Sequence, residues 1–244
     1  MISVIIPAYN SEYYIRETVR TVLKTLKDMP RPFEIIVVDD CSEDDTVLAL
    51  MEIYDKHLKD DVRIFTKFTN QGKGAAIRTG YKMAKGDHIA IMDADLQVKP
   101  DEIKTFFRIM NLYNADAVIG NKRHSFSNVR LPLKRWIISR GYGLMVKMLF
   151  GFPIRDTQCG FKLFKRKALE LIMDKIYVKR YAFDIEMLVA LRDSNCRIAD
   201  APVLMTKPIG PGSVSAVSIM NTAKDTLAVA WRRWHGSYNN KKRG

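Results

Sequence analysis

The stretch HIAIMDADLQ, residues 88–97, joins a short apolar run to a group of oxygen-bearing side chains. Residues 88–92 have the length and apolar character of a buried strand. Asp93, Asp95 and Gln97 follow at alternate positions, which places two carboxylates and an amide oxygen on one side of an extended segment. Such hard oxygen ligands suit Mg²⁺ or Mn²⁺ with a diphosphate completing the shell. The alternative is a helix N-terminus, because Asp is a preferred capping residue.

The same succession of strand and polar residues recurs through the first half of the chain. Short β-rich runs alternate with segments whose apolar residues have helical spacing, which is the pattern of βαβ units on a parallel sheet. The expected strands are residues 2–6, 34–38, 62–66, 88–92 and 117–120, and the expected helices are residues 11–26, 44–59, 74–84 and 99–113. Ligands of such sheets bind beyond the carboxyl ends of the strands. The polar residues after each strand are therefore the candidate site.

Three more polar groups follow the predicted strands. They are Pro7-Ala8-Tyr9-Asn10 with Glu12, then Asp39 and Asp40, and then Asn70-Gln71-Gly72-Lys73-Gly74. The two aspartates can accept hydrogen bonds from a base or from ribose hydroxyls, or they can cap the helix that follows. Tyr9 can flank a base. The third group can bring backbone N–H groups and one cation close to an anion at a helix start.

Other familiar nucleotide and metal sites are excluded. Residues 70–74 lack the spacing and the Ser or Thr of a Walker A loop, and no GxGxxG motif follows the first strand. The four histidines are scattered without metal-ligand spacing. Three cysteines, an odd and widely spaced set, favour a reducing compartment over a disulfide framework or a zinc site.

Composition and charge define the class of partner. A chain of 244 residues with 47% hydrophobic residues can bury one sizeable core. Its net charge of +13 predicts a surface that attracts phosphates, anionic lipids or nucleic acid. No nucleic-acid reader motif with clustered stacking aromatics occurs, so nucleic acid is the remote alternative. The N-terminal strand leaves no space for a signal peptide, and no stretch reaches the ~20 apolar residues of a membrane span.

Two basic amphipathic segments in the second half indicate peripheral membrane contact. Residues 131–150 carry an apolar stripe with interspersed Lys and Arg, and residues 219–234 place tryptophans beside Arg232 and Arg233. Such helices can lie in the headgroup region, or can pack their stripe on the domain core. We therefore predict a catalytic domain over residues 1–215, including an interface helix at 131–150, and a basic amphipathic helix and tail over residues 216–244.

Together and in this order, the motifs of the first half resemble the inverting family 2 glycosyltransferases of the GT-A fold. In the second half, residues 155–164 and 181–188 are similar to segments of polyprenyl-phosphate sugar synthases, and the dolichyl-phosphate glucose synthases show the greatest similarity, with the mannose synthases next. The resemblance implies a Rossmann-like α/β fold with a mostly parallel sheet flanked by helices. It implies Mg²⁺- or Mn²⁺-dependent transfer of a hexose from UDP-glucose or GDP-mannose to dolichyl or polyprenyl phosphate, at the cytoplasmic face of a membrane.

The resemblance also assigns roles to single residues. The nucleotide sugar would contact Pro7, Ala8, Tyr9, Glu12, Asp39, Asp40, Lys73 and Asp93. The metal would bind Asp95 and Gln97, with Asp95 also in a catalytic role. Arg123 and Arg135 fall where the mannose synthases hold the acceptor phosphate, and further acceptor-side candidates are Asp156, Gln158, Asp184 and Lys207. Two segments depart from the family pattern: Cys41 replaces a glycine, and residues 212–215 lack the usual lysine ending of a late loop.

A phosphate acceptor fits these residues chemically. A phosphate monoester with a second pKa of about 6 is already anionic near neutral pH and needs no general base. It needs cations, and guanidinium groups provide forked, permanently charged donors. The alternative is a family 2 transferase with a sugar or protein hydroxyl as acceptor, for which Asp184 or Glu186 would be the base. The expected partners are a nucleotide sugar, a lipid phosphate and a membrane surface. An integral-membrane protein is a further candidate partner.

Overall fold

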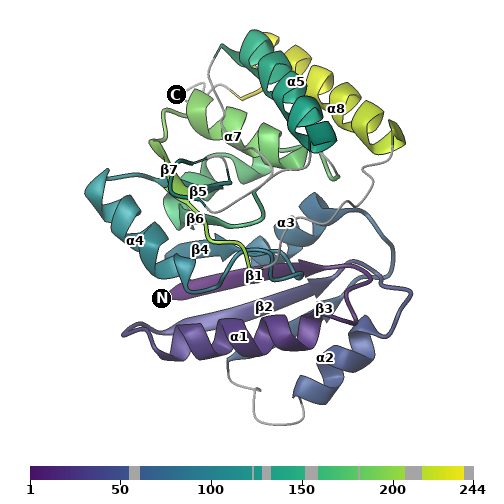
Figure 1. The fold of residues 1–244 in the computed structure, drawn as a ribbon, viewed down its shortest axis with the longest axis vertical. Coiled ribbons are helices and arrows are strands. Elements are labelled where there is room, and N and C mark those ends of the chain that lie inside the picture. The colour runs from purple at the N-terminus through teal and green to yellow at the C-terminus, as the bar shows by residue number, and fades with distance from the viewer. Residues whose placement is uncertain are drawn as a thin grey trace.

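The computed structural model describes residues 1–54, 61–122, 124–127, 133–151, 159–180, 182–206 and 216–238. In this part of the chain, seven strands form one sheet in the order β3-β2-β1-β4-β6-β5-β7 (Figure 1). The strands are β1 (Ile2–Ala8), β2 (Phe33–Asp39), β3 (Val62–Thr66), β4 (His88–Ile91), β5 (Ala117–Asn121), β6 (Lys162–Lys165) and β7 (Ile198–Pro202). β6 runs antiparallel to β4 and β5, and the other pairs are parallel. The predicted mostly parallel α/β sheet is confirmed.

Helices cover both faces of the sheet (Figure 1). They are α1 (Ile15–Lys27), α2 (Thr46–Tyr54), α3 (Lys73–Met83), α4 (Glu102–Leu112), α5 (Leu133–Phe150), α6 (Arg166–Glu170), the 3-10 turn η1 (Met173–Lys175), α7 (Phe183–Asp193) and α8 (Ala216–Trp234). Helices α1, α2 and α4 share one core with alternate residues of β1, such as Val4 and Ile6. Helices α3, α6 and α7 share the other core with Ile5. Because both faces are covered, β1 is apolar at successive positions.

The five strands expected in the first half are confirmed, and the helix starts differ by a few residues. Helix α1 begins at Ile15 rather than at residue 11, because the chain before it forms a turn bonded to the loop after β2. The Ser11 N–H donates to Thr46 Oγ1 at 2.7 Å, and the Glu12 N–H donates to Asp44 Oδ2 at 3.1 Å. These two bonds attach the loop after β1 to the loop after β2 and to the first residue of α2.

Helices α5 and α8 form an outer pair beside α7 (Figure 1). Tyr142 and Thr226 share a hydrogen bond of 3.1 Å between the two helices. Arg233 bonds to the Phe150 carbonyl at 2.8 Å and to Asp193 of α7 at 2.9 Å. Among the residues described, no helix combines the length and the apolar character needed to cross a bilayer.

Candidate active site at the carboxyl edge of the sheet

The predicted polar groups meet at one edge of the sheet. Strands β1, β2 and β4 are neighbours and parallel, so their carboxyl ends point the same way. Residues 9–12 follow β1, Asp39 and Asp40 lie at the end of β2, and residues 93–97 follow β4. The edge therefore joins a carboxylate-rich segment to the loops that we predict to hold a nucleoside.

Asp93 forms an ion pair with Lys73, the first residue of α3. The distance from Lys73 Nζ to Asp93 Oδ1 is 2.5 Å, and each side chain is 34% exposed. Burial alone would raise the pKa of the Asp93 carboxyl, but the Lys73 ammonium outweighs burial and holds this pKa below its usual value. Asp93 is thus a fixed carboxylate with a cation beside it, at the N-terminal end of a helix.

The backbone at Gly160 lies directly against Asp93. A Cβ atom at Gly160 would stand 1.9 Å from Asp93 Oδ2, which is far inside van der Waals contact. Only glycine leaves space for the carboxylate in this position. Gly160 belongs to the segment 155–164 that carries part of the family resemblance, and its contact with Asp93 gives that segment a physical role.

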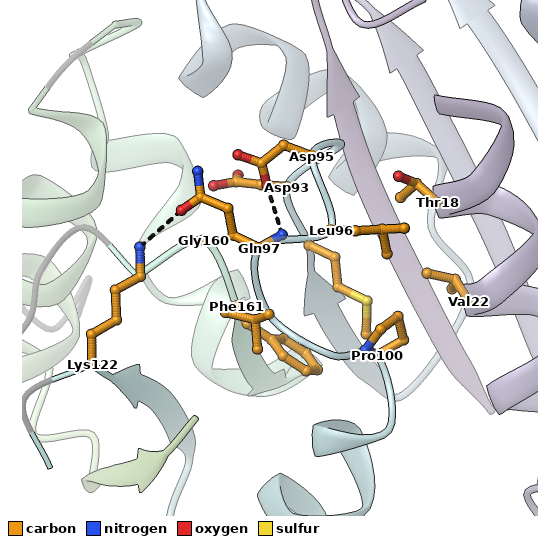
Figure 2. A pocket seen from close by; sticks show the side chains of 12 residues that line it. Thr18, Val22, Asp93, Asp95, Leu96, Gln97, Pro100, Lys122, Gly160 and Phe161 are labelled. Atoms are coloured by element: carbon orange, nitrogen blue, oxygen red, sulfur yellow. Dashed lines mark hydrogen bonds between the residues drawn. The ribbon is translucent and has the colours of Figure 1, made fainter. Parts of the chain in front are cut away.

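Asp95 and Gln97 lie on a tight turn beside Asp93 (Figure 2). Leu96 has a φ of 53°, and this left-handed turn lets the Gln97 N–H donate to Asp95 Oδ1 at 3.1 Å. Burial, and then the charge of Asp93, raise the pKa of the Asp95 carboxyl. A divalent cation would relieve both effects, because it supplies positive charge where ionisation is disfavoured.

The ligand set fits a metal that is shared with a substrate. Among the described residues, no group of three or more His, Cys, Asp or Glu side chains could enclose an ion. Mg²⁺ commonly binds one or two carboxylates and completes its shell with water and substrate phosphates. Asp95 and Gln97 match that pattern, so the residues present fit a divalent ion that arrives with a diphosphate.

Lys122 is a site residue that the sequence reasoning missed. It follows β5 directly, and its Nζ lies 3.4 Å from Gln97 Oε1 (Figure 2). It also lines the same pocket as Asp93 and Asp95. The rule that selects polar residues after each strand identifies Lys122 when it is applied to β5. The family resemblance points instead to its neighbour Arg123, which lies outside the described residues.

The predicted nucleoside residues are organised by bonds between loops. Asp40 accepts hydrogen bonds from Lys67 Nζ and from the N–H groups of Gln71 and Gly72, which fixes the loop before α3. Asp39 accepts from the Ser42 N–H at 3.2 Å. Both carboxylates therefore hold loops in place. The bonds of Asp40 go to the loop before α3, and Asp44 is the residue that accepts the Thr46 N–H at the start of α2, at 3.0 Å. The contact of Asp39 and Asp40 with a nucleoside stays a prediction.

The loop after β1 completes this edge. Pro7 and Ala8 are buried at the end of strand β1, and Tyr9, the next residue, is 43% exposed. Glu12 Oε2 accepts the Asp45 N–H at 3.1 Å, so Glu12 also links the loops after β1 and β2. The Tyr9 ring is exposed and therefore accessible to a base.

The two candidate bases on α7 have different surroundings. Glu186 is fully buried and accepts hydrogen bonds from the Tyr177 and Val178 N–H groups, from Arg232 and from the Tyr238 hydroxyl, at 2.6–2.9 Å. It connects α7 to α8 and cannot reach a substrate. Asp184 is 12% exposed and is paired with Lys162 at 2.7 Å.

Several predicted acceptor residues are not located by the structure. Arg123, Asp156, Gln158 and Lys207 lie outside the described residues, as do residues 212–215. Arg135 belongs to α5, and its side chain lies outside the described part. Their roles stay predictions.

Comparisons with known proteins identify the family of this chain. Residues 3–172 match the model of the family described as Glycosyl transferase family 2. The chain is 31% identical to the dolichyl-phosphate beta-glucosyltransferase of Homo sapiens over 97% of this chain and 77% of that protein. The chain therefore belongs to glycosyl transferase family 2 and is a glycosyltransferase. Within this family it resembles the dolichyl-phosphate beta-glucosyltransferases.

Solved structures share the fold. A glucosyl-3-phosphoglycerate synthase of Mycobacterium tuberculosis, crystallised with Mn²⁺, UDP-glucose and phosphoglyceric acid, has a TM-score of 0.70 at 17% identity, covering 96% of this chain and 79% of that one. A mannosyltransferase of Pyrobaculum calidifontis, crystallised with GDP-mannose and Mn²⁺, has a TM-score of 0.67 at 21% identity, covering 95% and 64%. The likeness to these nucleotide-sugar enzymes confirms the predicted fold class.

Proposed function

We propose that this enzyme transfers glucose from UDP-glucose to dolichyl phosphate, with inversion and with a divalent ion at Asp95 and Gln97. The observation that carries the proposal is the Asp93–Lys73 pair beside Asp95, at the sheet edge to which we assign the donor. The names of the similar enzymes support the acceptor and the sugar. GDP-mannose is the alternative donor.

The charges around Asp93 suit a metal diphosphate. Two carboxylates, Asp93 and Asp95, and two ammonium groups, Lys73 and Lys122, sum to zero. A divalent ion brings the site to +2, which matches the two negative charges on the diphosphate of a nucleotide sugar. The ion would act as a Lewis acid on the leaving diphosphate. Lys73 and Lys122 would add direct positive charge where negative charge develops. The Mn²⁺ in the two similar structures supports this assignment.

The acceptor side favours a phosphate over a hydroxyl. A hydroxyl acceptor needs a base, and of the two candidates on α7, Glu186 is saturated by four donors and Asp184 is neutralised by Lys162. A lipid phosphate is nucleophilic without a base. We assign its binding to Arg123 and Arg135, with Lys207, Asp156 and Gln158 as further candidates.

Arg135→Ala is expected to weaken use of the acceptor more than binding of the donor. The guanidinium would hold the incoming phosphate, and removal of one charge-assisted contact costs about 1.5–3 kcal/mol, or about 10- to 100-fold in apparent acceptor affinity. Steady-state kinetics with dolichyl phosphate in detergent, at saturating UDP-glucose, measures this effect. Unchanged acceptor kinetics would remove Arg135 from the site.

A direct assay tests the proposed reaction. The protein is incubated with Mn²⁺, dolichyl phosphate and radiolabelled UDP-glucose or GDP-mannose, and label is followed into the organic phase. We expect label from UDP-glucose in an acid-labile lipid. Label from GDP-mannose alone would correct the donor, and label found only in water-soluble acceptors would refute the lipid phosphate.

The outer helices carry exposed apolar side chains together with basic ones. Leu144 and Met148 of α5 are 58% and 71% exposed, and Leu227, Trp231 and Trp234 of α8 are 53%, 61% and 86% exposed. Basic residues of both helices accompany them, as in helices that lie in the headgroup region. We propose that this face binds the cytoplasmic surface of the membrane that carries the acceptor. An integral-membrane partner and the boundary between residues 215 and 216 stay predictions.

Replacing Trp231 and Trp234 together by Ala is expected to weaken binding to anionic vesicles by at least about tenfold, because each buried indole contributes more than 1 kcal/mol. Cosedimentation with phosphatidylserine vesicles measures the loss. The matched control replaces Leu112 and Tyr113, which are 76% and 63% exposed at the end of α4, away from α5 and α8. Equal binding by both double variants would show that the outer helices do not form the membrane face.

A further inference from the structure

Lys162 is a fully buried lysine at the start of β6, within the sheet. Its side chain is 1% exposed, and its Nζ donates to Asp184 Oδ1 at 2.7 Å and to the Cys159 carbonyl at 2.6 Å. A buried ammonium is stable only when paired and hydrogen-bonded. The β6 position could hold an apolar residue, as its neighbours Leu163 and Phe164 do. The charge at residue 162 therefore requires an explanation beyond packing.

The Lys162–Asp184 pair lies next to the Lys73–Asp93 pair. In the sheet, Lys162 is opposite Ile91, two residues before Asp93, and Gly160 of the same segment touches the Asp93 carboxylate. Asp184 and Phe183 begin α7. Phe183 also packs on Gly74 of α3, because a Cβ at Gly74 would stand only 2.4 Å from Phe183 Cδ2. Two lysines and two aspartates, each from a different segment of the chain, thus form two adjacent ion pairs at the donor edge.

The ion pairs of Lys73 and Lys162 interact electrostatically with each other. Burial would lower the pKa of the Lys73 ammonium, but the charges of Asp93, and after it Asp184, raise this pKa above its usual range. Lys73 therefore interacts favourably with both aspartates and forms its ion pair with Asp93. Lys162 supplies a competing cation that already occupies Asp184. Without Lys162, Asp184 would be a buried carboxylate that has lost this counter-ion, and Lys73 is a cation whose charge already interacts with it.

We propose that Lys162 is a positioning residue for the donor site. By neutralising Asp184, it keeps Lys73 in its ion pair with Asp93. The Asp93–Gln97 segment thereby stays arranged for a metal-bound nucleotide diphosphate. Asp184 is then the counter-ion of Lys162 and takes no proton from the acceptor. The inference rests on the proposed function only in requiring that Asp93 and its neighbours bind a nucleotide diphosphate.

A double-mutant cycle tests the proposal, with Lys162→Met, Asp184→Asn and the double variant. The readout is the Mn²⁺-dependent affinity for UDP, measured by calorimetry. We expect Lys162→Met to weaken UDP binding by about 10- to 100-fold, the coupling found within one ion-pair network, and the double variant to return to within about twofold of Asp184→Asn. Rescue follows because the double variant has no orphaned carboxylate to draw Lys73 away. A lysine that only stabilises the fold would lower the thermal unfolding midpoint of Lys162→Met and leave the UDP affinity of the folded protein unaltered. That result, or a double variant that binds UDP as weakly as Lys162→Met, would overturn the proposal.

Asp184→Asn keeps the test decisive if Lys162→Met does not fold. The amide oxygen can still accept from Lys162, so this variant is expected to retain UDP affinity within about tenfold and to retain transfer. Loss of transfer by about 1,000-fold with unchanged UDP affinity would identify Asp184 as a general base and overturn the proposal. UDP binding does not depend on the acceptor. A failure of transfer to dolichyl phosphate in the unaltered enzyme would therefore refute the proposed reaction alone.

Discussion

Asp95→Ala is expected to reduce glucosyl transfer by about 1,000-fold, because a divalent ion contributes several kcal/mol of charge stabilisation to the departing diphosphate. Asp95 provides the carboxylate that accepts the Gln97 N–H, and this bond holds the turn that brings the two ligands together. Substitution removes both the ligand and the hydrogen bond that holds the turn. The protein should stay folded, because burial and Asp93 already disfavour the charge of Asp95.

The measurement is initial rate against Mn²⁺ concentration, with thermal unfolding as the test of folding. Asp101→Ala is the matched control, since Asp101 precedes α4 and its side chain is 65% exposed in a pair with Lys104. The control should keep the activity of the unaltered enzyme. Chelation of the unaltered enzyme should reproduce the Asp95→Ala rate, and full activity in the presence of chelator would remove the metal from the mechanism.

The fold was predictable where strands are covered on both faces. β1 and β2 are apolar at successive positions because α1 packs on one face and α3 on the other. β6 and β7 lack that signal. β6 begins with Lys162, which is buried only because Asp184, 22 positions later, neutralises it. β7 is an edge strand with an aspartate and a proline, so its pattern does not distinguish it from a loop.

The candidate site was predictable to the extent that it follows strand ends. Asp93, Asp95 and Lys73 come from such positions, and the structure brings them together. The partners supplied by the second half of the chain were not predictable. Gly160 meets Asp93 across the pairing of β4 with β6, and local sequence contains no information on that antiparallel register. Assigning roles to such residues requires the tertiary structure.

Gly160→Ala is expected to lower kcat/KM for the donor by about 100-fold, the effect of a displacement of about 1 Å in a catalytic group. The added methyl would stand 1.9 Å from Asp93 Oδ2, so the carboxylate or the 159–161 backbone has to move. Asp93 is held on its other oxygen by Lys73, and the backbone is held by the Lys162 bond to the Cys159 carbonyl. Either movement separates Asp93 from Lys73 or shifts the pocket wall.

Gly141→Ala is the matched control, because a Cβ at Gly141 meets no described atom within 4 Å. In the interior of helix α5, this change should stabilise the protein by about 0.5–1 kcal/mol and leave UDP binding as it was. Calorimetric UDP affinity and donor kinetics of the two variants separate a local clash from a general effect of Gly→Ala. If Gly160→Ala binds UDP and transfers glucose as well as Gly141→Ala does, Asp93 tolerates displacement and its fixed position beside Lys73 is not required for donor binding.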